Sequence, residues 1–86
     1  MIMTERETKL AKQILELLHE EDGHQISEVS LHGALTTKVD VGLGEFNALI
    51  SQLDRQGWVT IVPSRMNNRI RKININDAGE AALLEL

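Results

Sequence analysis

The stretch from 45 to 75 constrains the fold most, because it passes from a helical pattern to a strand pattern at a single glycine. Its first part carries apolar residues at i, i+3, i+4 and i+7, which line one face of an α-helix: Phe46, Leu49, Ile50 and Leu53. Gly57 follows, and a glycine just past the last periodic residue can take the left-handed conformation that ends a helix. The pattern therefore predicts a helix over about 43–56 that stops at Gly57.

Two runs rich in β-branched residues follow this glycine. The first, at 58–62, reads Trp-Val-Thr-Ile-Val and is bounded by Pro63, which favours a strand. Residues 64–68 are turn formers, and 69–75 resumes as a second strand that places three residues on one face: Arg71, Ile73 and Ile75. The sequence thus predicts a β-hairpin with a polar, basic tip directly behind the helix.

One helix is predicted near the start of the chain and another at its end. Thr4 and Glu7 have the spacing of a capping box. They open a helix over 4–19, whose apolar stripe consists of Leu10, Ile14, Leu17 and Leu18. Asn76 can cap a final helix over 76–86 that has an acidic residue in its first turn.

The segment between the first helix and the central helix is predicted as a short strand and a short helix. Residues 24–26 suffice for one strand that could pair with the edge of the hairpin. Ser27 can cap a helix that runs to about residue 37, with three apolar residues available for burial: Val29, Leu31 and Leu35. Residues 36–42 form a β-branched connection, and either Asp40 or Gly42 can cap the central helix.

Length and composition bound the class of protein. A chain of 86 residues suits one domain spanning 1–86. It has no cysteine, so disulfides and thiolate metal sites are excluded. No apolar run approaches the roughly 20 residues of a membrane span, and the first residues lack the apolar core of a signal peptide, so we expect a cytoplasmic protein that has no membrane partner. One Phe, one Trp and no Tyr leave few rings for stacking on single-stranded bases.

Charge is divided unevenly along the chain. From Arg55 to Asn76 there are five basic residues and no acidic one, which gives +5. The remainder holds four basic and thirteen acidic residues, which gives −9 and accounts for the net charge of −4. Basic residues in a hairpin can simply guard edge strands against aggregation. They are also the electrostatic footprint that phosphate groups require, and this second interpretation is the favoured one.

Three short motifs in the second half occur in an informative order. They are Leu-Asp-Arg-Gln-Gly-Trp-Val at 53–59, Asn-Asn-Arg at 67–69 and Ile-Asn-Asp-Ala-Gly at 75–79. Over roughly 43–86 they resemble the MarR group of transcription regulators. In that group a leucine-containing helix ends in a glycine before a strand, the wing carries Asp-x-Arg, and Leu-Thr-x-x-Gly opens the next helix. Here Asn67 stands in place of the wing aspartate and Asn76 in place of the capping threonine.

The resemblance implies an α+β fold, a small winged helix-turn-helix with a three-helix core, a β-hairpin wing and a short C-terminal helix. It implies the role of the wing as well. The chain has no room for the long dimerisation helices that usually flank the winged core in that group, so ligand binding and regulation are not carried over.

We expect such a chain to bind double-stranded DNA as a transcriptional regulator or accessory factor. The central helix, about 43–56, would lie in the major groove and the wing, 63–69, on the backbone or in the minor groove. Arg69, at the end of the Asn-Asn turn, is the main candidate for the minor groove. The carboxylate of Glu45 would repel phosphate unless it accepts a hydrogen bond from a cytosine amine. The predicted DNA-binding residues are Asn47, Ser51, Gln52, Arg55, Arg65, Asn68, Arg69, Arg71 and Lys72.

Other binding functions stay open at this point. The acidic remainder and the sparse outer face of the central helix also fit a winged protein-interaction module without nucleic-acid binding. An exposed apolar patch on the first or central helix would favour that module, whereas RNA binding would use the same basic hairpin. Three or four phosphate contacts bind weakly, so a homodimer or a partner protein is expected, with candidate contacts at Leu83, Leu84 and Leu86.

The sequence does not support catalysis or metal binding. His19, His24 and His32, with the acidic residues at 20–22, invite a metal interpretation, but their spacing matches no tight site. No nucleophile triad or carboxylate pair stands in a supporting motif, and Gly-Leu-Gly at 42–44 is too short for a phosphate loop. We therefore expect a protein that is not an enzyme and needs no cofactor or metal.

Overall fold

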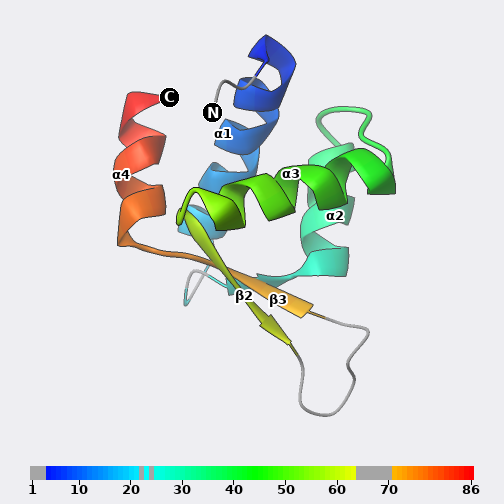
Figure 1. The fold of residues 1–86 in the computed structure, drawn as a ribbon. Helices are drawn as coiled ribbons and strands as arrows, with labels where there is room; N and C mark the ends of the chain where they lie inside the picture. The colour runs from blue at the N-terminus through cyan, green and yellow to red at the C-terminus, as the bar shows by residue number, and fades with distance from the viewer. Residues whose placement is uncertain (1–3, 22, 24, 64–70) are drawn as a thin grey trace.

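The computed structural model describes residues 4–21, 23, 25–63 and 71–86. Within them the chain forms helices and strands in the predicted order of helix, strand, helix, helix, hairpin strands and helix. Figure 1 shows α1, α2 and α3 gathered on one side of the sheet, with α4 beside α1. The strands β2 and β3 extend away from the helices. The elements are α1 (Glu5–Glu20), β1 (Gln25–Ser27), α2 (Glu28–Thr36), α3 (Leu43–Arg55), β2 (Val59–Pro63), β3 (Arg71–Ile75) and α4 (Asp77–Glu85).

The strands form one antiparallel sheet in the order β1-β3-β2. Ile73 of β3 faces Ile26 on one side and Ile61 on the other, so three isoleucines share the face that packs on the helices. The predicted pairing of the short first strand with the hairpin is thereby confirmed. Pro63, predicted to follow the strand, is its last residue, which an edge strand tolerates because its lost N–H would face solvent.

Local capping chemistry starts α1 and α2 as the sequence predicts. Thr4 Oγ1 accepts a hydrogen bond from the Glu7 backbone N–H (3.1 Å), and Glu7 Oε1 accepts one from the Thr4 N–H (3.0 Å). This reciprocal pair is a complete capping box. The Ser27 side chain caps α2, whereas α3 begins after Gly42 and has no side-chain cap. The N-terminus of α3 is thus the one in greatest need of support from elsewhere in the fold.

The helix stop at Gly57 is a Schellman motif. Gly57 has φ +77°, its N–H donates to the Asp54 carbonyl (3.0 Å), and the Trp58 N–H donates to the Leu53 carbonyl (3.1 Å). Trp58 therefore belongs to the helix end, and β2 begins one residue later than predicted, at Val59. The turn directs β2 away from α3 and fixes where the hairpin leaves the helical layer.

Gly79 brings α4 against this turn. The Asn76 N–H donates to the Trp58 carbonyl (3.2 Å), and the Asn76 side chain caps α4 by accepting from the Gly79 N–H (2.9 Å). A Cβ at position 79 would overlap the Trp58 carbonyl oxygen and lie 2.8 Å from Cγ1 of Ile75. The glycine that closes the third sequence motif is thus required for close packing, and Asn76 caps α4 as the sequence predicts.

The core is one cluster of aliphatic side chains around Phe46, which is fully buried. The expectation that Val29 is buried is wrong, because 67% of it is exposed. In α2 the buried residues are Leu31 and Leu35, one turn apart, and Val29 lies about 200° around the helix from Leu31. No helix among the described residues is both long and apolar enough to cross a bilayer.

Candidate nucleic-acid interface

After the exposed Leu43 at its start, the face of α3 that points away from the core is mostly small and polar. With Phe46, Ile50 and Leu53 buried, the exposed residues are Leu43, Gly44, Glu45, Asn47, Ala48, Ser51, Asp54 and Arg55, and Gln52 is half-buried at the side. Short side chains let the helix backbone approach a partner closely, and amide and hydroxyl groups can donate or accept hydrogen bonds. The four predicted DNA-binding residues of this helix are therefore at least partly exposed, and Asp54 is an acidic neighbour of Arg55.

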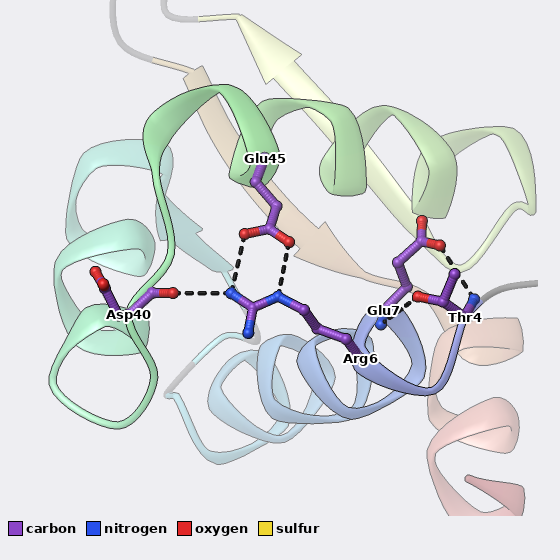
Figure 2. A network of polar contacts seen from close by, with 5 residues as sticks. All are labelled: Thr4, Arg6, Glu7, Asp40 and Glu45. Atoms are coloured by element: carbon purple, nitrogen blue, oxygen red, sulfur yellow. Dashed lines mark hydrogen bonds and ion pairs between the residues drawn. The ribbon is translucent and has the colours of Figure 1, made fainter.

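The first turn of α3 is tied to α1 by Arg6. Its Nε and Nη2 donate to the two carboxylate oxygens of Glu45 (2.9 and 3.1 Å), and Nη2 also donates to the Asp40 carbonyl (2.9 Å), as Figure 2 shows. The hydrogen bond from Arg6 lowers the pKa of Glu45 below its ordinary value. Glu45 is thus a charged carboxylate whose charge is balanced within the fold.

Arg71 is engaged in a second ion pair. Its Nη2 and Nε donate to the two carboxylate oxygens of Glu28 in the first turn of α2 (2.7 and 3.0 Å). The bond from Arg71 lowers the pKa of Glu28. The guanidinium of this predicted DNA-binding residue therefore braces β3 against α2, and its charge is largely compensated.

Lys72 is the exposed cation of the described part of the hairpin. It alternates with Arg71 along β3 and pairs with Val62 of β2, on the face of the sheet that points away from the core. The remaining predicted wing residues, Arg65, Asn68 and Arg69, lie outside the described residues, as does Asn67. Among the described residues, the hairpin thus offers one solvent-facing cation, and α3 adds the exposed Arg55 in its last turn.

His19 and His32, the histidines among the described residues, both have structural contacts. His19 Nδ1 lies 3.1 Å from Oε1 of Glu80 and links α1 to α4. His32 Nε2 lies 2.9 Å from the Val41 carbonyl, which fixes the proton on that nitrogen, and its ring packs at 5.0 Å from that of Phe46. His24 lies outside the described residues, and the described part of the chain contains no group of three residues suited to hold a metal ion.

Large exposed aliphatic side chains occur at three places in the described residues: between α2 and α3, at Val62 of β2, and in α4. Val29 and Leu43, 67% and 59% exposed, border a hollow of about 370 Å³ between α2 and α3, whose other walls are Glu28, His32 and Asn47. In α4, Leu84 is almost fully exposed, whereas Leu83 and Leu86 pack against the core. The three leucines predicted as a partner contact are therefore divided between core and surface.

Sequence reasoning missed both ion pairs that shape this face. Their partners lie 39 and 43 residues apart, so no local pattern joins them. One signal was present in the sequence: Glu45 occupies the third helical position without a serine or threonine cap three residues before it, which leaves its carboxylate without the usual local partner.

A helical layer over a small antiparallel sheet, in which the third helix leads directly into a two-stranded ribbon, is a winged helix-turn-helix. Solved structures give the same result. The chain is similar to AbsC, a MarR family transcriptional regulator from Streptomyces coelicolor, with 15% identity, a TM-score of 0.74, and coverage of 87% of this chain and 48% of AbsC. It is similar to the transcriptional regulator BldR from Sulfolobus solfataricus, with 26% identity, a TM-score of 0.69, and coverage of 90% and 50%.

A third similar structure is a mutant MarR from E. coli complexed with operator DNA, with 23% identity, a TM-score of 0.62, and coverage of 96% of this chain and 51% of MarR. The chain thus has a MarR-like winged-helix fold, as its motifs imply, and it spans about half the length of these three proteins. No protein-family model and no curated protein sequence matches it.

Proposed function

We propose that this protein binds double-stranded DNA, as a transcriptional regulator or accessory factor, with α3 in the major groove and the hairpin on the backbone or in the minor groove. One observation carries the proposal: beyond Leu43 the outer face of α3 is mostly small and polar, and the only acidic residue in its first turn is paired with Arg6. The first turn of such a helix can enter a groove about 12 Å wide without bringing an uncompensated negative charge to it. Asp54, the other exposed acidic residue of α3, lies in the last turn beside Arg55.

The distribution of charge supports the same orientation. Arg55 ends α3, Lys72 faces solvent on β3, and the sequence of the hairpin tip adds Arg65 and Arg69. These residues give about four phosphate contacts. Arg71 instead bonds to Glu28 and holds β3 against α2. The similarity to a MarR complexed with operator DNA points in the same direction. So few contacts bind weakly, and Leu84 is the exposed residue best suited to meet a second chain.

Fluorescence anisotropy on a labelled random-sequence duplex tests the proposal. The logarithm of the binding constant is expected to fall with the logarithm of salt concentration at a slope of about −3 to −4. Lys72→Ala and Arg69→Ala are each expected to reduce the steepness by about 1. Lys12→Ala, which removes an exposed cation from α1, serves as the matched control and should leave the slope unchanged. A flat salt dependence, or equal losses in all three variants, would rule out the proposed surface.

A protein-interaction module is the second candidate, and the hollow bordered by Val29 and Leu43 favours it. Two exposed aliphatic side chains make a small patch, which places this candidate behind DNA binding. Leu43→Ser separates the two functions, because it removes apolar surface at the start of α3 without changing any charge. Retained duplex binding with the slope above supports DNA as the ligand. Competition between duplex DNA and RNA in the same assay then decides between the two nucleic acids.

A further inference from the structure

The start of α3 is supported differently from the start of α1. Both helices carry a glutamate at the third helical position, Glu7 in α1 and Glu45 in α3. Glu7 reaches back to the Thr4 backbone and closes a capping box, whereas Glu45 turns towards Arg6 (Figure 2). With Gly42 as cap and Gly44 in its first turn, α3 has little intrinsic restraint where it begins, since glycine loses the most conformational freedom on folding. The restraint comes from another helix.

We propose that Arg6 is a positioning residue for nucleic-acid binding by α3, an inference that rests on the proposed function. One guanidinium from the first turn of α1 holds both carboxylate oxygens of Glu45 and the carbonyl of Asp40. It thereby joins α1, the α2–α3 connection and the first turn of α3. The planar fork of an arginine suits this geometry, because two parallel donors meet the two carboxylate oxygens while a third bond reaches the backbone.

The ion pair between Arg6 and Glu45 also compensates the negative charge in the first turn of α3, the end that would enter the major groove. The Glu45 side chain is 40% exposed, and it lies in the same turn as Gly44 and two residues before Asn47, which face outward. An unpaired carboxylate there would stand within about one Debye length, roughly 8–10 Å, of phosphates that flank the groove. Pairing with Arg6 cancels that repulsion before DNA arrives. Arg6 thus acts through Glu45 and Asp40 and need not touch DNA itself.

Four variants test the assignment in the duplex-binding assay: Arg6→Ala, Glu45→Gln, the double variant, and Lys9→Ala. Arg6→Ala should weaken binding by roughly three- to tenfold at low salt, because it exposes the Glu45 carboxylate. Glu45→Gln should bind at least as tightly as the native protein. The double variant should bind more tightly than Arg6→Ala but less tightly than Glu45→Gln, because the repelling charge is removed while the restraint by Arg6 stays lost. Lys9→Ala removes the same charge from an exposed position on the same helix and should have little effect.

Two outcomes would overturn the inference. A double variant that binds as weakly as Arg6→Ala, with a salt slope lowered by about 1, would make Arg6 a direct phosphate contact. If Lys9→Ala weakens duplex binding as much as Arg6→Ala does, the loss of affinity would come from the net charge of α1 and not from the pair with Glu45.

Nuclear magnetic resonance on the free protein separates this inference from the proposed function. Arg6→Ala should shift the backbone amides of 42–46 and return the pKa of the Glu45 carboxyl upward towards its ordinary value, whereas Lys9→Ala should do neither. If the native protein fails to bind duplex while these changes occur, the proposed function falls and the support of α3 by Arg6 stands. If the two variants give the same spectra around α3, the positioning role falls, whatever the DNA affinity.

Discussion

Arg71→Ala is the substitution that most directly separates support of the wing from contact with DNA. In the folded protein the Arg71 guanidinium makes two hydrogen bonds to Glu28, at 2.7 and 3.0 Å, and joins β3 to the first turn of α2. The Glu28 side chain is only 14% exposed and that of Arg71 is 36% exposed. Removing Arg71 would therefore leave a mostly buried carboxylate without its partner, whereas removing Glu28 would leave a cation that water can reach.

The magnitude follows from this difference in burial. A buried polar group that loses its partner costs about 1–3 kcal/mol, and the exposure of the guanidinium places this pair in the lower half of the range. We expect Arg71→Ala to lower the free energy of unfolding by about 1–2 kcal/mol and Glu28→Gln by about 1 kcal/mol. The coupling energy in the double-mutant cycle should be about 1 kcal/mol. For a chain of this length, each kcal/mol corresponds to a decrease of about 4–8 °C in Tm.

Urea unfolding at neutral pH, followed by circular dichroism, measures these energies for the two single variants and the double variant. Lys72→Ala is the matched control, since it removes a cation from the adjacent, exposed position of the same strand and should change stability by less than about 0.5 kcal/mol. A coupling energy of zero within error, or equal destabilisation by Lys72→Ala, would refute the structural role of Arg71. The residue would then become available as a direct DNA contact.

Two further predictions concern pH and the docking of α4. Because the bond from Arg71 depresses the pKa of Glu28 from its ordinary 4.5, the pair contributes stability that is fully present above that value and is lost as pH falls through the folded pKa. Unfolding free energy measured across acidic pH should therefore decline less steeply in Glu28→Gln than in the native chain, and identical profiles would contradict this. Gly79→Ala should destabilise by about 1–3 kcal/mol in urea unfolding, because its methyl group would overlap the Trp58 carbonyl. Gly33→Ala, in an open position of α2, should instead stabilise by about 0.5–1 kcal/mol, and similar effects of both substitutions would disprove the packing argument.

The sequence by itself determined the features that depend on contacts within about five residues. The capping box at Thr4, the asparagine cap at Asn76 and the Schellman stop at Gly57 are all closed by neighbours in the chain. The 3.6-residue period of α3 and the alternation along β3 also follow from local geometry, so the buried faces could be predicted residue by residue. The order of elements and the winged-helix resemblance rest on the same local signals.

Only the tertiary structure decided how charges are paired and which ambiguous apolar residues are buried. Local patterns place Arg6 in the first helix and Arg71 on the same strand face as Ile73 and Ile75, but they give the partner of neither. Each is held by a glutamate about forty residues away. Val29 and Leu31 are both aliphatic residues of α2, so the sequence predicts burial for both. Only the direction in which α2 packs decides that Leu31 is buried and Val29 is exposed. The physical reason is that a charge or a methyl group at the surface of one element gains its role from whichever element folds against it, and that neighbour is set by the packing of the whole core.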